Sequence, residues 1–292
     1  MAAEIIDKEA VSRLRNITFR LAPRGRGAKV GIHRSLLRGI SHNFLEYKEY
    51  SYGDELKHID WRVYGRLDRF YVKKFEDEVN FTWFILLDKS NSMGYGSGDI
   101  TKLDYAVRLS ATLAYLLLRQ GDSVGVVDFS SGRGNVVVPR AGMNHLEPIL
   151  VGLSSVKPGG KTSFIEPVAQ AAEKIKTDTA FILISDFFTD TDSLKEAMRL
   201  LSAVGKGTAL LHVVDRDEIE FNFEGFTEFE DMEEEIKVPV DAKDIKETYI
   251  KRMNDFIETI KLICLECGAY YIPSPLNLPA EEVLLNLAYK GA

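Results

Sequence analysis

Residues 81–92 read FTWFILLDKSNS, and this stretch decides how the rest of the chain is interpreted. The run 81–87 is almost entirely apolar and ends at Asp88, as expected for a short strand that is buried on both faces of a parallel sheet. A second run of the same kind, at 179–185, is followed by Asp186. Because ligands of open α/β sheets bind at the carboxyl ends of strands, the sequence predicts both a fold class and the sheet edge where a site would lie.

Apolar strands and helices alternate along the chain after residue 80. Thr101 with Asp104 three residues later matches a capping box that starts a helix, and Gly121 fits the left-handed stop at its end. Alternation of this kind implies right-handed crossovers between parallel strands, with helices on both faces. We therefore predict an α/β fold with a doubly wound, mostly parallel, Rossmann-type sheet, to which a hairpin at 123–138 adds one antiparallel strand. Further helices are predicted at 143–153, 164–176, 192–204, 243–266 and 279–289, and further strands at 208–214 and 269–272.

The pattern before residue 80 is different. Turn-rich pieces separate short runs that contain Tyr, Val and Phe, which indicates short strands, and one helix is expected around 8–21. We therefore predict two domains: an N-terminal extension of short strands and one helix over residues 1–79, and the sheet domain over residues 80–292.

The composition is that of a folded chain without disulfides. Of the 292 residues, 45% are hydrophobic and 28% are charged, and the two cysteines, Cys264 and Cys267, are too few for a secreted disulfide framework. We expect these cysteines to pack near a helix end rather than to bind zinc or react. The first eight residues lack the apolar segment of a signal peptide, and no apolar run approaches the roughly 20 residues that span a bilayer. These features predict a cytoplasmic protein without membrane insertion.

Charge is unevenly distributed along the chain. The net charge is −7, which argues against nucleic-acid binding by the chain as a whole. Residues 13–38 contain eight Lys or Arg and no acid, whereas residues 218–235 contain nine acids, no base and four Phe. The basic segment suggests a solvated face or a cover for the acidic body, with a nucleic-acid or lipid patch as the alternative. The acidic segment suggests a surface loop, with partner binding as the alternative.

Three oxygen-bearing side chains follow the first strand at alternate positions. In extended backbone, residues two apart point the same way, so Asp88, Ser90 and Ser92 would present their oxygens on one side. Thr162 follows a glycine turn, and Asp186 ends the second strand at the same sheet edge. Hard oxygen donors on a compact loop suit Mg²⁺ or Mn²⁺. A simpler interpretation stays open, in which these side chains are only turn residues and helix caps.

This set of residues resembles the metal-ion-dependent adhesion site of von Willebrand factor A domains. The resemblance rests on the order of the residues: Asp88-x-Ser90-x-Ser92, then Thr162 after a glycine turn, then Asp186 at a strand end. It implies a von Willebrand A-like fold over about the last 210 residues. It also implies that Ser90, Ser92 and Thr162 would supply hydroxyl ligands, while the two aspartates would act directly or through water.

The region upstream resembles the DUF58 family. The resemblance is carried by residues 49–62, EYSYGDELKHIDWR, and by residues 72–76, VKKFE. Members of this family have a von Willebrand A-like domain and are often encoded beside MoxR-type AAA+ ATPases, which implies such an ATPase as a partner. Within the site, Asn91 stands where glycine is common and Lys89 adds a cation, which would affect metal affinity more than architecture.

These features favour a binding module over an enzyme. A cation that directly contacts only one carboxylate can accept an Asp or Glu of a partner protein at its open position. The five histidines are far apart in the sequence, His212 is expected to pack inside a strand, and Asp215 could approach the site from the next strand end. We therefore predict no catalytic residue and a non-enzymatic, Mg²⁺-dependent protein-binding module, such as an adaptor or assembly factor. The alternatives are a metal-dependent hydrolase or phosphotransferase that uses the same crevice, and a metal-free scaffold.

Overall fold

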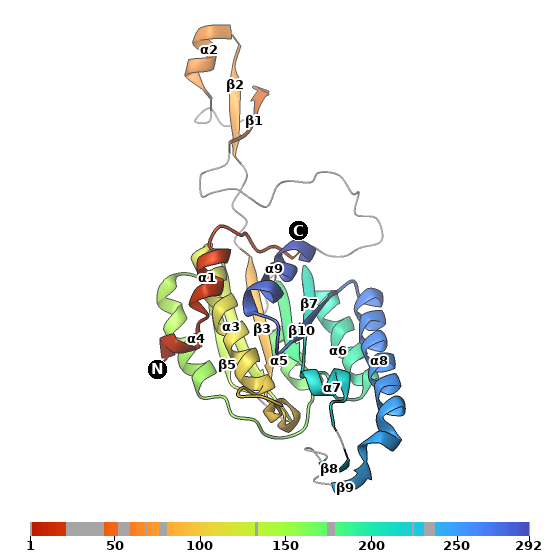
Figure 1. Ribbon diagram of the computed structural model, residues 1–292. Coiled ribbons are helices and arrows are strands. Elements are labelled where there is room, and N and C mark those ends of the chain that lie inside the picture. Colours follow the sequence, from red (N-terminus) through yellow and green to blue (C-terminus); the bar gives the residue numbers. More distant parts are fainter. Residues whose placement is uncertain are drawn as a thin grey trace. The chain divides into compact units, whose positions relative to one another are not determined.

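The computed structural model describes residues 2–21, 44–51, 59–67, 69–75, 81–131, 134–173, 179–223, 225–230 and 237–291. The chain divides into two compact units, residues 1–36 with 81–292 and residues 37–80 (Figure 1). The expected division placed all of residues 1–79 in one extension. The described residues 2–21 belong instead with the sheet, because apolar side chains of this segment are buried in its core. These side chains are Ala10, Leu14, Phe19 and Leu21.

A six-stranded sheet forms the centre of the first unit. Its strands are β3 (Thr82–Asp88), β4 (Ser123–Phe129), β5 (Val136–Arg140), β6 (Thr179–Ser185), β7 (Gly207–Val214) and β10 (Tyr270–Pro275). They lie in the order β10-β7-β6-β3-β4-β5, and every neighbouring pair is parallel except β4 and β5. The antiparallel edge strand is the one that the hairpin predicts, and the predicted doubly wound α/β fold is confirmed.

Helices cover both faces of this sheet (Figure 1). Successive side chains of a strand point to opposite faces, so Trp83, Ile85 and Leu87 of β3 enter one apolar cluster while Phe84 and Leu86 enter the other. The first cluster also contains side chains of α1 (Lys8–Leu14), α3 (Lys102–Arg119), α4 (Leu146–Ser154) and α9 (Ala280–Gly291). The second contains side chains of α5 (Ile165–Glu173), α6 (Thr191–Val204) and α8 (Ala242–Glu266). Within the part of the chain that the structure describes, no helix is both long and apolar enough to cross a membrane.

Local sequence signals set the two ends of α3. Thr101 and Asp104 form the predicted capping box, in which each side chain accepts a hydrogen bond from the backbone N–H of the other residue. Gly121 follows the helix with a φ of 97°, the left-handed conformation that glycine adopts readily. The helix therefore starts at a defined residue, Lys102, whose side chain matters at the candidate site.

Other elements differ from the sequence-based expectation. The helix expected over 8–21 ends at Leu14, and the residues that follow contribute to the core in non-helical conformation. The acidic segment includes most of a short helix, α7 (Arg216–Glu220), and leads into a two-stranded hairpin of β8 (Phe226–Glu230) and β9 (Lys237–Asp241) that is separate from the main sheet. These pieces are short and polar, so they show no apolar period from which they could be predicted.

The second unit, residues 37–80, has little core in its described part. It contains β1 (Phe44–Glu49), α2 (Trp61–Leu67) and β2 (Tyr71–Phe75), and β1 pairs with β2 in antiparallel fashion. Among the residues of this unit whose burial is described, only Ile59, Asp60 and Val72 are buried. Large side chains of α2 consequently remain on the surface.

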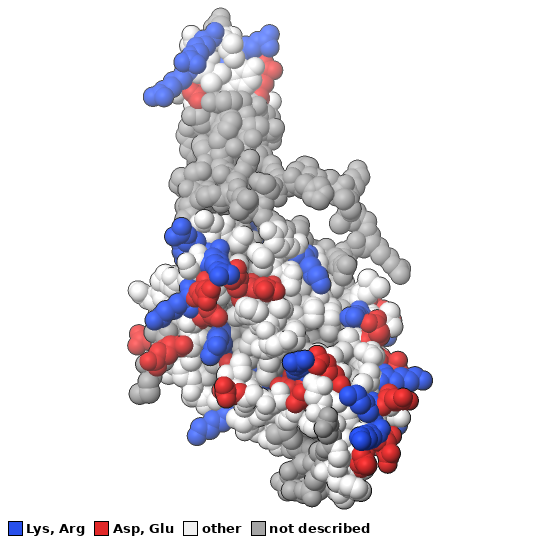
Figure 2. Space-filling model, viewed as in Figure 1, with Lys and Arg blue, Asp and Glu red and all other residues white. Residues whose placement is uncertain are grey.

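Acidic and basic side chains are interspersed over the sheet unit on the face shown in Figure 2. Most of the basic segment 13–38 lies outside the described residues, and the acidic segment 218–235 is described only in part. Arg13, which is described, contacts the carboxylates of Glu9 and Glu281, so its charge is balanced locally. The roles suggested for the two segments stay predictions.

Both edge strands of the six-stranded sheet contain proline, and the four inner strands contain none. The prolines are Pro139 in β5 and Pro273 and Pro275 in β10. Proline has no N–H to donate to a neighbouring strand, which confines it to the borders of sheets. Both borders are therefore poor templates for a further strand.

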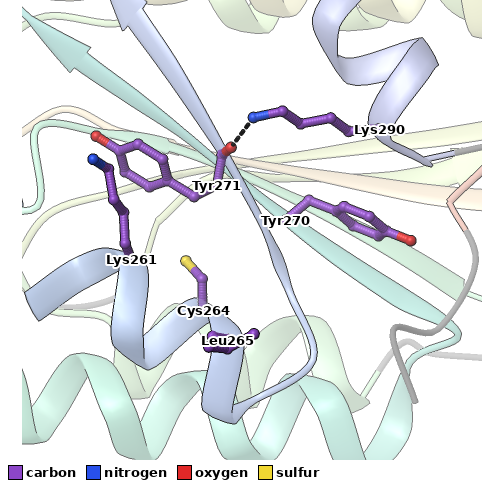
Figure 3. A pocket seen from close by; sticks show the side chains of 6 residues that line it. All are labelled: Lys261, Cys264, Leu265, Tyr270, Tyr271 and Lys290. Atoms are coloured by element: carbon purple, nitrogen blue, oxygen red, sulfur yellow. Dashed lines mark hydrogen bonds between the residues drawn. The ribbon is translucent and has the colours of Figure 1, made fainter. Parts of the chain in front are cut away.

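A pocket of about 400 Å³ lies beside β10, between α8 and α9 (Figure 3). In it, the Lys290 ammonium donates to the backbone carbonyl of Tyr271 at 3.1 Å, and the Lys261 ammonium lies over the Tyr271 ring. Cys264, which also lines the pocket, is buried, Cys267 is half-buried, and neither belongs to a disulfide. The residues that line the pocket include no Asp, Glu or His.

A buried carboxylate joins the start of β3 to the turn after α3. Asp122 accepts hydrogen bonds from the indole N–H of Trp83 at 2.7 Å and from the backbone N–H of Phe81 at 3.0 Å. The side-chain amide of Gln120 donates to the same carboxylate. Asp122 thereby satisfies donors that the close packing around Trp83 removes from water.

We expect Asp122→Ala to lower the free energy of unfolding by about 3 kcal/mol, because the buried Trp83 indole N–H and the Phe81 N–H lose their acceptor. Urea unfolding followed by tryptophan fluorescence measures the change. Asp99 is an exposed carboxylate in the loop before α3, and Asp99→Ala should change stability by less than about 0.5 kcal/mol. Similar losses in both variants would contradict the assigned role.

Candidate functional site

The candidate site lies where the strand order of the sheet reverses. From β3 the chain moves outward through β4 and β5, returns to β6 and then moves outward on the other side through β7 and β10. The carboxyl ends of β3 and β6 therefore flank the switch point, where open α/β sheets bind ligands. The two strands pair with Leu87 opposite Ile184, so their last residues, Asp88 and Ser185, stand at the same level.

The loop after β3 folds back on Asp88. The backbone N–H of Ser90 donates to Asp88 Oδ1 at 2.8 Å, which holds the carboxylate against its own loop. A single 3-10 turn, Asn91–Gly94, then places Ser92 beside Ser90, with 3.1 Å between the two Oγ atoms. Asp88 and Ser90 are fully buried. The three oxygen-bearing side chains thus lie together at the end of β3.

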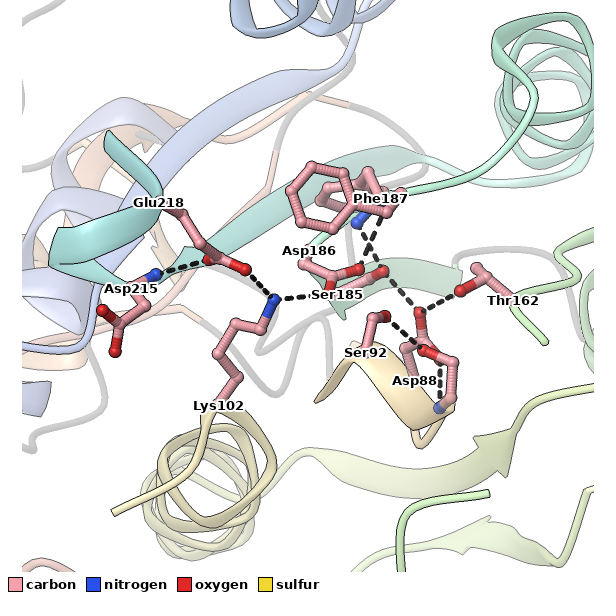
Figure 4. A network of polar contacts seen from close by, with 11 residues as sticks. Asp88, Ser92, Lys102, Thr162, Ser185, Asp186, Phe187, Asp215 and Glu218 are labelled. Carbon is pink, nitrogen blue, oxygen red and sulfur yellow. Dashed lines mark hydrogen bonds and ion pairs between the residues drawn. The ribbon is translucent and has the colours of Figure 1, made fainter. Parts of the chain in front are cut away.

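A glycine turn brings Thr162 to the same place from a distant part of the chain. Residues 159–160 are held to residues 89–91 by two backbone hydrogen bonds of 2.7 and 2.9 Å. Gly160 has a φ of +80°, and a Cβ there would lie 2.6 Å from a neighbouring serine Oγ, so this position requires glycine. The turn leads to Thr162, whose hydroxyl donates to Asp88 Oδ2 at 3.4 Å (Figure 4).

Asp186 is near this cluster but has a different partner. It follows the last residue of β6, so strand alternation turns it toward the face covered by α3, whereas Ser185 faces Asp88. The Ser185 hydroxyl donates to Asp88 Oδ2 at 2.6 Å, and Asp186 Oδ2 accepts from Lys102 Nζ at 2.7 Å. Lys102 also donates to Glu218 at 2.5 Å, and both Lys102 and Asp186 have fully buried side chains (Figure 4).

The buried Lys102 ammonium connects α3, β6 and α7. Burial alone would lower the pKa of Lys102, but the carboxylates of Asp186 and Glu218 outweigh burial and raise it above its ordinary value. The ammonium also lies 4.9 Å from the centre of the Phe188 ring. Glu218 in turn accepts the backbone N–H of Asp215 at 2.8 Å, the residue that caps α7. Lys102 therefore acts as a fixed internal cation next to the site.

Among the described residues, none supplies such a cation to Asp88. Burial and the nearby charge of Asp186 raise the pKa of Asp88 to about 7, although hydrogen bonds from Ser185 and Ser90 oppose the rise. A positive charge beside Asp88 would favour its ionised form and lower this pKa. The electrostatics of the cluster therefore favour a bound cation at Asp88 rather than at Asp186.

The oxygens at this edge fit a small divalent cation in kind and in spacing. Around Mg²⁺ with six oxygens at ~2.1 Å, neighbouring oxygens are ~3.0 Å apart. The Ser90–Ser92 contact of 3.1 Å and the Thr162–Asp88 contact of 3.4 Å are close to that spacing. Within the described residues, no three His, Cys, Asp or Glu side chains form a metal cluster, but three of the four donors here are hydroxyls. The set fits a cation held by Asp88 and these hydroxyls.

Asp186 fits less well as a direct ligand. Its Oδ2 binds Lys102, and its Oδ1 accepts the backbone N–H of Phe188 at 3.2 Å. Both carboxylate oxygens are thus engaged within the protein. Direct or water-mediated ligation by Asp186 stays a prediction, and the geometry favours the water-mediated form.

Sequence reasoning missed Lys102, Ser185 and Glu218. Ser185 could have been found, because the two strands have seven residues each and end together, which places residue 185 opposite residue 88. No sequence signal marks Lys102, because a lysine in the first turn of an amphipathic helix is ordinarily solvated. Glu218 lay in the segment expected to be a loop.

Three residues considered from the sequence have other roles. Lys89 points away from the cluster and pairs with Asp128 at 2.5 Å. Asp215 caps α7 and accepts the backbone N–H of Ser97 at 2.9 Å. His212 is buried in β7, where burial lowers its pKa to about 4, and its Nδ1 contacts the Tyr271 hydroxyl at 2.8 Å. His212 therefore packs as expected.

The family model described as "Protein of unknown function DUF58" matches residues 46–256 of this chain. Uncharacterized proteins of Mycobacterium tuberculosis and Mycobacterium bovis are each 22% identical to it over 190 residues, which is 64% of this chain and 60% of the relative. The match thus spans less than two thirds of these curated relatives.

Several solved structures are similar to this chain in fold. BatB from Bacteroides thetaiotaomicron is 17% identical, with a TM-score of 0.47 over 73% of this chain and 98% of that one. An aerotolerance-related membrane protein from Bacteroides fragilis is 17% identical, with a TM-score of 0.46 over 72% of this chain and 100% of that one. A von Willebrand factor type A protein from Catenulispora acidiphila is 13% identical, with a TM-score of 0.42 over 76% of this chain and 43% of that one. These likenesses concern the fold and carry no argument about function.

The two aspartates should respond in opposite directions to neutralisation. The folded-state pKa of Asp88 is raised from 3.8 to about 7, so the folded protein keeps a proton there that the unfolded chain releases at lower pH. The free energy of unfolding should therefore fall as pH rises between about 4 and 7. We expect Asp88→Asn to weaken this slope and to stabilise the protein at pH above 7 by about 2 kcal/mol.

Asp186→Asn should instead destabilise the protein by about 3 kcal/mol, because Lys102 would stay buried with one carboxylate fewer. Urea unfolding in EDTA at acidic and at mildly alkaline pH measures both variants. Equal pH slopes in wild type and Asp88→Asn, or a gain in stability from Asp186→Asn, would refute this assignment of charges.

Proposed function

The chain belongs to the DUF58 family, and from the geometry of its own site we propose that it is a non-enzymatic, Mg²⁺-dependent protein-binding module. The observation that carries the proposal is the convergence of four oxygen-bearing side chains at the switch point of the sheet. They come from two segments that are 70 residues apart in the sequence, and they are Asp88, Ser90, Ser92 and Thr162.

The two aspartates would contribute unequally to neutralising a bound cation. Asp88 would be the one direct carboxylate, and the three hydroxyls add donors without charge. Lys102 already balances Asp186, so that carboxylate contributes little to neutralising a second cation. When bound, Mg²⁺ or Mn²⁺ would supply a positive charge that a partner's Asp or Glu carboxylate can approach. We propose a protein ligand of this kind.

The surroundings of the site support binding more than catalysis. A hydrolase would need a base within reach of an attacking water. His212 has a pKa lowered to about 4 and is fully buried, and Asp215 is held as a helix cap. Asp88 has a pKa raised to about 7, the range of a general base, but a carboxylate that ligates the cation would not be available for that role. The DUF58 resemblance makes a MoxR-type AAA+ ATPase the first partner to test.

A metal-free scaffold is the second candidate, and one observation favours it. Lys102 already places a positive charge at the strand ends, paired with two carboxylates. In that case the hydroxyls and Asp88 would form a hydrogen-bonded rim with Asp88 partly protonated near neutral pH. Metal binding to the purified protein separates the two candidates.

We expect Mg²⁺ and Mn²⁺ to bind wild type, and Thr162→Ala to weaken the affinity by about tenfold or more, because it removes one oxygen of the set. Titration calorimetry measures both. Thr259→Ala is the matched control, because Thr259 is half-buried on α8 and its hydroxyl donates to a carbonyl of its own helix at 2.8 Å. Its metal affinity should equal that of wild type.

Negligible heats of metal binding in wild type would contradict the metal site and favour the metal-free scaffold. If the metal binds, a purified MoxR-type ATPase should be retained by the immobilised chain in Mg²⁺ and released by EDTA. Retention that EDTA does not affect would contradict metal-dependent binding. If wild type hydrolyses phosphate esters and Asp88→Ala does not, the protein is an enzyme and the proposal of a binding module is wrong.

A further inference from the structure

The unit formed by residues 37–80 presents large aromatic side chains to solvent. Trp61 is 64% exposed and Phe70 is 41% exposed. The rings of Tyr64 and Phe70 stack at 4.4 Å, and the Trp61 ring meets both edge-on, at 6.3 and 6.2 Å. The three rings pack on one another, and much of Trp61 and part of Phe70 remain exposed to water.

Two arginines belong to the same helix as Trp61 and Tyr64. Arg62 and Arg66 are one helical turn apart, so they share one side of α2, and Gly65 lies between that side and Trp61 around the helix. Both are exposed, and neither forms an ion pair with another described residue. Blue side chains are visible over this part of the molecule in Figure 2. We define the aromatic–arginine patch as Trp61, Arg62, Tyr64, Arg66 and Phe70.

Gly65 leaves bare backbone in the middle of this patch. Glycine weakens a helix interior relative to alanine, so its presence needs a reason. A Cβ at Gly65 would meet no atom within 4 Å, so packing within the chain does not require glycine here. A bare helix backbone between Trp61 and Arg66 allows a partner to approach closely, which is a common use of glycine at contact surfaces.

The composition of the patch indicates the chemistry of that partner. Trp, Tyr and Arg are the residue types most enriched in the hot spots of protein interfaces. Two guanidinium groups one turn apart, with no ion pair to a described residue, complement carboxylates, and exposed rings complement aromatic side chains. We infer that the aromatic–arginine patch is a docking surface for an acidic protein segment that also carries aromatic side chains.

Charge favours a protein segment over other anions. The chain as a whole carries −7, so a long polyanion or an anionic membrane is repelled by most of the molecule. A short acidic segment carries fewer charges than either of these, and the two arginines can pair with part of them. The inference does not depend on the metal site, because the patch belongs to the other unit.

A synthetic peptide with the sequence of residues 218–236, EIEFNFEGFTEFEDMEEEI, is the probe, because it combines nine acids with four Phe. The full-length protein has two tryptophans, of which Trp83 is fully buried, so acrylamide quenching reports on Trp61. We expect the peptide to protect Trp61 from quenching, with an affinity that falls as salt rises. Absence of protection at low salt would overturn the inference.

Charge reversal tests which side chains bind. We expect Arg62→Glu with Arg66→Glu to weaken binding of the peptide at least about tenfold. A peptide in which Glu228 and Glu230 are replaced by Lys should bind this variant better than the original peptide does. Lys251→Glu with Arg252→Glu, an equal charge change at exposed positions of α8, is the matched control and should leave the affinity unchanged. An equal loss of peptide affinity in the control variant would show that binding depends only on the net charge of the protein, and would overturn the inference.

Gly65→Gln tests the patch without removing a charge. Glutamine favours helix and its Cβ meets no neighbour, so circular dichroism should show an intact fold, whereas affinity for the peptide should drop at least about tenfold. Unchanged affinity would refute close approach at this residue. A single-stranded oligonucleotide or anionic phospholipid vesicles that protect Trp61 better than the peptide does would assign the patch to another class of partner and overturn the inference.

Discussion

The in-register parallel pairing of β3 with β6 is the constraint on which the candidate site depends. It sets Asp88 and Ser185 opposite each other at the end of the two strands, within hydrogen-bonding distance. Because Asp186 is one residue further, its side chain is directed to the opposite face of the sheet, toward Lys102. A slip of one residue would exchange the faces, and a carboxylate would then replace the serine hydroxyl next to Asp88.

Lys102 gives the two aspartates different electrostatic states. Asp186 shares a buried ammonium with Glu218, whereas Asp88 is surrounded by hydroxyls and backbone amides and has a pKa raised to about 7. The same ammonium couples the strand end to α7, most of which belongs to the acidic segment. The site is therefore a cluster of one uncompensated carboxylate and neutral donors, next to an ion pair that serves the stability of the fold.

Much of the sheet could be predicted from the sequence, because buried parallel strands are continuous apolar runs and α3 carries both of its end signals, Thr101 and Gly121. The proximity of Thr162 to Asp88 could be predicted only from the resemblance to a metal-ion-dependent adhesion site. A glycine turn alone does not indicate which other loop of the chain it contacts. Lys102 could not be predicted, because its burial depends on two carboxylates from distant elements. α7 and the β8–β9 hairpin could not be predicted for a different reason: these elements are too short to show an apolar period.

The prolines at the two borders of the sheet have a consequence for how this protein can associate. A seventh strand, whether from a second copy or from an extended peptide, would find missing amide donors along β5 and β10. Fibre growth by edge-to-edge stacking of sheets is disfavoured for the same reason. Association through the six-stranded domain is then left to side chains presented by its helices and loops, where specificity is set by shape and charge rather than by generic backbone pairing.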